Sequence, residues 1–261
     1  MQVREMIAKA PCEQEEKILL SHVADVLERS RSRNIPTFTD FLSPREQALV
    51  KSVLHVYDFT FWGGREDAER CVCVSLPDYL DETWLYADEA PLTALRAEFS
   101  DREKLTHRDF LGSLMGCGIQ RSAVGDILVS DHSCDFFVTK AMAPYVQQNL
   151  LSAGRVKLSV SEIDLHEVLI PVQKVTDQKD TVASLRLDAV CASAFRLSRE
   201  KAAIAIQAGK VSLNNLPCEK PDKQVCEGDA LSLRGAGKAV LAEVSGKTKK
   251  GRIAILLRRY V

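Results

Sequence analysis

The chain lacks the segments that would carry it into or across a membrane. Its first ten residues include Arg4, Glu5 and Lys9 and contain no apolar run of the kind that secretory signal peptides need. No apolar stretch elsewhere approaches the length of a transmembrane helix. These absences predict a cytoplasmic protein with no membrane contact.

Metal and cofactor motifs are also missing. The 8 cysteines are scattered, and the pair Cys71 and Cys73 has no second pair at the spacing of a zinc site. Without a secretory signal, such thiols are expected to be reduced and mostly buried. The glycines at 63–64 and 235–237 match neither a dinucleotide-binding fingerprint nor a P-loop. We therefore predict no metal site and no cofactor.

Charge is present in both signs but is unevenly distributed. The formal net charge of the whole chain is −1, yet residues 182–261 hold 15 Lys and Arg against 7 Asp and Glu. The preceding 181 residues hold 20 against 29. This asymmetry predicts a nucleic-acid-binding C-terminal part on a body that does not itself bind polyanions. A chain of 261 residues has room for two or three domains.

Residues 1–90 are predicted to form an acidic module of helices and a hairpin. The spacing of apolar residues indicates an amphipathic helix, in which His22 is expected to be a buried core histidine. Its predicted stripe is Ile18, Leu19, His22, Val23, Val26 and Leu27. The residues SPRE at 43–46 are a capping box with proline at the first helical position, which predicts a helix over 44–55.

Two strands are predicted later in this module. Alternating residues over 57–61 and 70–76 indicate them, and the glycine pair at 63–64 separates them. The aromatic residues of the first strand lie beside that turn, where aromatic side chains can stack on bases. Ordinary burial tendencies favour a hydrophobic core for them instead.

Residues 91–165 show the βαββαβ order of a ferredoxin-like domain, the plan shared by RRM domains. The predicted elements are a strand at 93–99, a helix from 106, strands at 124–129 and 134–138, a helix at 141–151 and a strand at 155–160. Thr106 and Asp109 mark a helix start, so His107 is expected to be solvated rather than catalytic. The aromatic RNP signature is absent, so no RNA role is predicted for this domain.

Residues 182–261 are predicted to begin with two short helices and to continue into strands. The first helix is indicated by an apolar stripe at Leu187, Val190, Cys191 and Ala194. Ser198 is expected to cap the second helix, and Gly209 to end it. A strand follows at 211–213, with a turn at Asn214-Asn215.

Basic side chains of this module cluster at helix starts and turns. They are Arg186, Arg196, Arg199, Lys201, Lys210, Arg234 and Lys238. Cations beside helix N-termini suit an RNA backbone, so we predict that these residues bind phosphates. Ser198 is expected to fix the second helix in this site, and Asn214 to bond a 2′-OH or a base edge. The positive field is extended by Lys247, Lys249, Lys250, Arg252, Arg258 and Arg259.

The segment from 186 to 238 resembles the S4-type RNA-binding domain. The resemblance is carried by RLD at 186–188, FRLSREKA at 195–202, GKVSLN at 209–214 and GDALSLRGAGK at 228–238. It implies an αα-β fold that binds structured RNA. The alternative from composition is a small αβ domain whose basic face is merely solvated.

Further segments resemble the YlmH family, and with the S4-type module the resemblance covers essentially the whole chain. They are FWGGREDAER at 61–70, LTHRDFLG at 105–112 and RSAVGDILV at 121–129. Trp62 and Asn215 depart from the family pattern, where a smaller aromatic residue and a glycine are expected. The resemblance implies binding to structured rRNA and tRNA on the large ribosomal subunit. It further implies ribosome-associated quality control, in which an S4-type protein holds peptidyl-tRNA while a tailing factor extends the stalled chain without a template.

S4-type domains are often fused to RNA-modifying enzymes, so catalysis is an alternative. Pseudouridine synthases have a catalytic aspartate in a G-R-L-D stretch, but here Leu185 replaces the glycine, and Asp188 fits a helix first turn favoured by the dipole. A methyltransferase would need a glycine-rich strand–turn–helix. We predict a non-catalytic α+β protein with no catalytic residues. An interaction scaffold linked to cell division, with the basic face on an acidic protein or an anionic membrane, is the other alternative. The membrane version is disfavoured because the basic residues do not lie on one amphipathic helix with a bulky apolar face.

Overall fold

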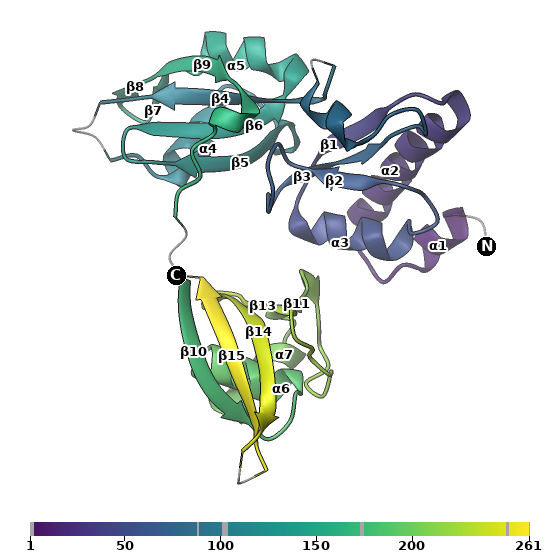
Figure 1. The fold of residues 1–261 in the computed structure, drawn as a ribbon, viewed down its shortest axis with the longest axis vertical. Coiled ribbons are helices and arrows are strands. Elements are labelled where there is room, and N and C mark those ends of the chain that lie inside the picture. Colours follow the sequence, from purple (N-terminus) through teal and green to yellow (C-terminus); the bar gives the residue numbers. More distant parts are fainter. Residues whose placement is uncertain (1–2, 88, 101–103, 173–174, 249–250, 261) are drawn as a thin grey trace. The chain divides into compact units, whose positions relative to one another are not determined.

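A computed structural model describes residues 3–87, 89–100, 104–172, 175–248 and 251–260. The chain divides into two compact units, Met1–Pro171 and Val172–Val261 (Figure 1). Each unit has its own hydrophobic core and mixes helices with strands. The predicted α+β class is therefore confirmed.

The first unit begins with helices packed on a three-stranded antiparallel sheet, whose strand order is β1-β3-β2. The elements are α1 (Val3–Lys9), α2 (Gln14–Arg33), β1 (Thr37–Leu42), α3 (Pro44–Val53), β2 (Thr60–Trp62) and β3 (Cys71–Ser75). The predicted capping box starts α3, because Ser43 and Glu46 each accept a hydrogen bond from the other's backbone N–H. It satisfies two N–H groups that a helix leaves unpaired.

The buried face of α2 differs from the predicted stripe. His22 is exposed, and Ile18 is 62% exposed. The residues that face the core are Leu20, Val23, Ala24, Val26, Leu27 and Ser30. The face is rotated because α2 packs on β1, where the Thr37 hydroxyl donates to the carbonyl of Val26 at 3.0 Å. The prediction of a core histidine at position 22 was wrong.

Strand β1 was not predicted from the sequence, and its burial pattern explains why. Thr37, Thr39 and Phe41 face inward, whereas Phe38 is 43% exposed. The buried threonine hydroxyls are paired, and Thr39 accepts from the N–H of Cys73 in the neighbouring strand at 2.9 Å. Because polar residues lie on the buried face, the usual alternation of apolar and polar residues is inverted.

Residues 92–163 form the predicted βαββαβ domain. Strands β4 (Leu92–Glu98), β5 (Val124–Val129), β6 (Ser133–Thr139) and β9 (Ser159–Ile163) pair antiparallel in the order β5-β6-β4-β9. β6 lies between β4 and β5, which is the split βαβ arrangement. The connecting helices are α4 (His107–Gly116) and α5 (Ala143–Asn149), and β7 (Ser152–Ala153) pairs with β8 (Val156–Lys157). His107 is exposed at the start of α4, as predicted.

Both faces of this four-stranded sheet are buried. One face packs against the helices through Phe136 and Phe110, which are fully buried. The opposite face packs against the three-stranded sheet, where Phe137 lies in one core cluster with Phe41 and Trp62. Short 3-10 helices complete the unit at Glu82–Tyr86, Arg121–Ala123, Lys140–Met142 and Leu165–Glu167.

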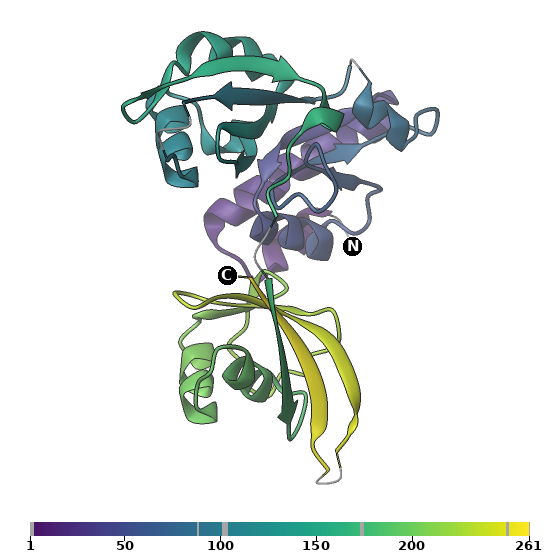
Figure 2. The same ribbon diagram turned by 60° about the vertical axis from the view of Figure 1, so that its left-hand side comes forward.

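The second unit is a six-stranded antiparallel sheet with α6 (Leu187–Ala194) and α7 (Arg199–Gln207) on one face (Figure 2). Its strands are β10 (Val175–Val182), β11 (Val211–Leu213), β12 (Leu216–Pro217), β13 (Ala230–Leu233), β14 (Gly237–Lys247) and β15 (Ile253–Tyr260). β10 pairs with β15 over its whole length, so the unit begins ahead of residue 182, where the sequence placed the boundary. Most residues of β10 are polar, so the sequence pattern did not predict this strand.

The predicted αα-β elements of this unit are present. The stripe on α6 is fully buried, at Leu187, Val190, Cys191 and Ala194. The Ser198 hydroxyl accepts from the N–H of Lys201 at 3.2 Å and so caps α7. Asn214 and Asn215 have positive φ values of 50° and 67°, which the hairpin turn requires.

Membrane-spanning helices and metal-binding clusters are both absent from the residues that the structure describes. In the described ranges, no helix combines the length and the apolar character needed to cross a membrane. No group of three or more His, Cys, Asp and Glu within those same ranges is placed to hold a metal ion. The cysteines are free thiols, and burial raises the pKa of Cys71 to about 11.

Candidate nucleic-acid interface

Asp188 joins two of the predicted RNA-binding arginines. Its side chain lies on the first turn of α6 and is only 7% exposed. Its carboxylate lies 3.1 Å from the guanidinium of Arg186 and 3.2 Å from that of Arg199. Burial alone raises the pKa of Asp188, but hydrogen bonds from both guanidiniums outweigh it, so the pKa is lowered. The ionised carboxylate therefore holds two half-exposed cations side by side.

The N-terminal end of α6 is occupied by the chain itself. The N–H groups of Leu187 and Asp188 donate to the carbonyls of Lys223 and Pro221 at 2.8 and 2.9 Å. These are the N–H groups that a free helix N-terminus offers to a phosphate. Side chains, rather than the start of α6, must therefore supply any phosphate contact at this point.

Arg196 lies in the turn between the two helices and has a positive φ of 55°. The turn is closed by the N–H of Leu197, which donates to the carbonyl of Ala192 at 2.9 Å. Glycine is the residue that adopts this backbone conformation without strain, and another residue there costs roughly 1–2 kcal/mol. The Arg196 side chain is exposed, and no acceptor for it lies among the residues that the structure describes. Such a strained, unpaired cation is a functional candidate.

The remaining predicted cations divide into two groups. Lys201 is exposed on α7, and Lys210 and Arg234 are exposed on neighbouring segments joined by a 3.0 Å bond from the Arg234 N–H to the Lys210 carbonyl. Lys238 alternates with the buried Ala239 on β14, so it points to the sheet face opposite the helices. Its ammonium lies 5.5 Å from the centre of the Tyr260 ring. The structure does not bring Lys238 to the helical face with the others.

Asn214 has a structural function that was not predicted. Its side-chain amide donates to the carboxylate of Asp229 at 2.7 Å, and its side-chain oxygen accepts from the N–H of Ala230 at 2.9 Å. Both ends of the amide therefore tie the hairpin turn to the start of β13. Any RNA contact from Asn214 would have to be made by the same side-chain atoms that form these hydrogen bonds.

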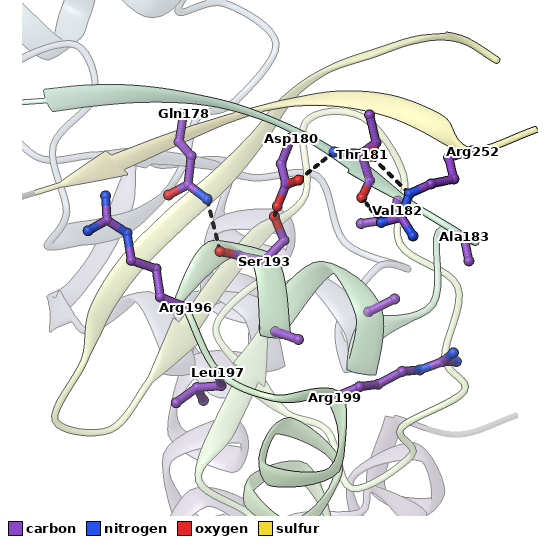
Figure 3. A pocket seen from close by; sticks show the side chains of 12 residues that line it. Gln178, Asp180, Thr181, Val182, Ala183, Ser193, Arg196, Leu197, Arg199 and Arg252 are labelled. Carbon is purple, nitrogen blue, oxygen red and sulfur yellow. Dashed lines mark hydrogen bonds between the residues drawn. The ribbon is translucent and has the colours of Figure 1, made fainter. Parts of the chain in front are cut away.

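The sequence assigned Arg252 only to the extended positive field, whereas the structure places it beside two of the predicted RNA-binding arginines. It precedes β15, and its guanidinium donates to the hydroxyl of Thr181 on β10 at 2.9 Å. Arg252 lines an open hollow of about 440 Å³ together with Arg196 and Arg199 (Figure 3). Its proximity to them depends on the β10–β15 pairing, which no local pattern indicates. The predicted field residues Lys249 and Lys250 lie outside the described residues.

Two family models match segments of this chain. Residues 185–231 match the S4 domain model, and residues 96–167 match a model described as "Putative RNA-binding domain in YlmH". The "Ribosome-associated protein quality control protein P2" of Bacillus subtilis (strain 168) is 38% identical over 224 residues, which are 85% of this chain and 86% of that protein. The chain belongs to the YlmH family.

One solved structure shares the fold over part of this chain. It is the "Cell division protein ylmH from Streptococcus pneumoniae", 20% identical, with a TM-score of 0.50. The match covers 60% of this chain and 96% of that one. At this identity the likeness shows a shared fold and nothing further.

The YlmH-type domain cannot use the RNA-binding mode of an RRM. RRM domains stack bases on aromatic residues of the four-stranded sheet. In this chain the sheet face away from the helices carries Phe137, which is fully buried against the N-terminal sheet. Arg96 and Asp135 are adjacent on paired strands and form an ion pair of 2.7 Å, and Asp135 is 1% exposed. The cations that remain accessible around α6 and α7 are therefore the stronger RNA-binding candidates.

Proposed function

We propose that this YlmH-family chain is a non-catalytic protein that binds structured rRNA and tRNA on the large ribosomal subunit during rescue of stalled translation. Its S4 domain would stabilise peptidyl-tRNA while a nascent-chain tailing factor acts. The supporting observation is the Arg186–Asp188–Arg199 cluster, in which a buried carboxylate fixes two guanidiniums. Preorganised guanidiniums lose less side-chain entropy on binding phosphate and can contact it bidentately.

The same cluster argues against the enzyme alternative. A catalytic aspartate of a pseudouridine synthase type must reach its substrate, whereas the carboxylate of Asp188 is 7% exposed and both its oxygens accept from arginine. An ionised carboxylate in such a pair serves best as a fixed counter-charge. The name of the Bacillus subtilis relative supports the ribosome-associated part of the proposal.

The test is co-sedimentation of the intact protein with ribosomal fractions from a cell lysate. The wild-type protein is expected with the large subunit, and an Arg196→Ala/Arg199→Ala variant at the top of the gradient. The matched control is Arg29→Ala/Arg33→Ala, which removes the same charge from exposed positions of α2. It should sediment like the wild type. Sedimentation of the first variant with ribosomes, or absence of the wild type from them, would contradict the proposal.

A further inference from the structure

The open hollow beside the α6–α7 turn has chemistry that phosphate binding alone does not use. β10 forms one wall and α6 the other, and the volume of about 440 Å³ falls within the range of about 300–1,000 Å³ typical of small-molecule sites. Apolar side chains lie between its polar groups, at Val182 on β10, Ala189 and Ala192 on α6, and Leu197 in the turn after α6.

Positive charge dominates the lining of the hollow. The charged residues that line it are Arg196, Arg199, Arg252 and Asp180. The Asp180 carboxylate is occupied, because it accepts from the Ser193 hydroxyl and from the N–H of Thr181. Figure 3 shows these bonds on the upper wall, with the arginine side chains lying around the hollow. An occupant should therefore carry negative charge and also a flat apolar part that fits over the alanines.

We propose that this hollow accepts the base of one unpaired nucleotide of a structured RNA, with its phosphates on Arg196 and Arg199. The inference rests on the proposed function and adds a specificity element to it. A nucleotide combines a flat base with an anionic backbone, and arginine guanidiniums both stack on bases and bind phosphates. A base held in a duplex cannot enter, so RNA with a bulged or flipped nucleotide is preferred.

The strand β10 makes this site possible. It supplies Gln178, Asp180 and Thr181 to the wall, and it lies before residue 185, where the match to the S4 domain begins. Thr181 also holds the guanidinium of Arg252. The unpaired-nucleotide site is therefore an addition to the S4 domain, formed when β10 pairs with β15.

The experiment uses the full chain and two RNA hairpins of one stem sequence. In one hairpin a single 2-aminopurine is bulged, and in the other it is paired with uridine. The wild type should bind the bulged hairpin about tenfold more tightly, equal to about 1.4 kcal/mol. Acrylamide quenching of the bulged 2-aminopurine should fall on binding. Equal affinity for both hairpins would overturn the nucleotide site alone, whereas no binding to either would overturn the proposed function as well.

Filling the hollow tests the contribution of the nucleotide site separately from that of the charges around it. Ala192→Leu adds volume to the α6 wall without changing charge, and should reduce the preference for the bulged hairpin to less than about twofold. The control Ala254→Leu adds the same volume on β15, at a half-buried position outside the hollow and the core cluster. It should keep the preference. Ala183→Phe is a second filling variant at an exposed position outside the helices, for use if Ala192→Leu is poorly folded. A folded filling variant that keeps the preference would overturn the inference.

Discussion

Gly64 packs directly on the ring of Phe137, so that a Cβ atom at Gly64 would lie 2.3 Å from Cδ1 of that ring. Gly64 follows β2 of the N-terminal sheet, and Phe137 lies on β6 of the ferredoxin-like domain. This contact helps to bury the sheet face that binds RNA in RRM domains. It makes the two sheets of the first unit one packed body, in which the N-terminal module covers the second sheet.

Substituting this glycine should destabilise the first unit. Gly64→Ala meets the Phe137 ring and also strains a backbone with φ of +88°, so we expect a loss of about 2–4 kcal/mol in the free energy of unfolding. Denaturant unfolding measures it. The control Gly112→Ala lies on α4 with open space around its Cβ, and should be stabilising by about 0.5–1 kcal/mol. Similar stabilities for both variants would contradict this packing.

The pKa of Asp188 predicts a pH-dependent stability. Its folded-state pKa lies below the ordinary value of 3.8, so its contribution is present above that value and is lost as pH falls through the folded pKa. Asp188→Asn should therefore reduce stability at pH 7 by about 1–2 kcal/mol, a figure lowered because both arginines are partly exposed. The difference from the wild type should shrink below pH 3.8. A difference that is constant with pH would show that charge is not responsible.

Substitution of Arg196 should weaken RNA binding while leaving the free energy of unfolding nearly unchanged. Arg196→Gly relieves the positive φ but adds freedom to the unfolded chain, so the free energy of unfolding should stay within about 1 kcal/mol of the wild type. Affinity for tRNA should fall about fivefold to tenfold, because a phosphate contact is lost. Filter binding and thermal melts measure the two effects. Arg196→Lys keeps the charge and should retain most of the affinity; unchanged affinity in Arg196→Gly would exclude this arginine from the interface.

The salt dependence of RNA binding should report the number of phosphate contacts. With about five direct contacts, the logarithm of the tRNA association constant should fall with log salt at a slope of about −3.5 to −4.5. The Arg196→Ala/Arg199→Ala variant should have a slope shallower by about 1.4–1.8. Its thermal melt should change little, because Arg186 still pairs with Asp188. A slope near zero would defeat the electrostatic account, and a collapsed melt would make these arginines structural.

The elements of the fold that were predictable from the sequence are those specified by local spacing. The α6 stripe from Leu187 to Ala194, the Ser43 capping box and the Asn214-Asn215 turn each depend on residues a few positions apart, and each is present. The βαββαβ order followed from the same kind of pattern. Local spacing could not reveal β1 or β10, because their polar residues are satisfied by distant partners.

The candidate site was predictable in part for the same reason. Basic residues at turns identified Arg186, Arg196 and Arg199 as candidates. The sequence placed Asp188 beside them as a helix first-turn residue, but not as their shared counter-ion. The approach of Arg252 and the outward direction of Lys238 depend on which strands pair.

The sequence by itself determined the α+β class of this protein: its periodicities specified most of the helices and strands, and its charge distribution marked the C-terminal part as basic. The tertiary structure alone decided which surfaces are open. In the folded chain the sheet face around Phe137 is buried, and a hollow lies open between β10 and α6. The physical reason is that secondary structure follows from neighbours along the chain. Burial and charge pairing instead depend on residues far apart in sequence, such as Gly64 with Phe137 or Thr181 with Arg252.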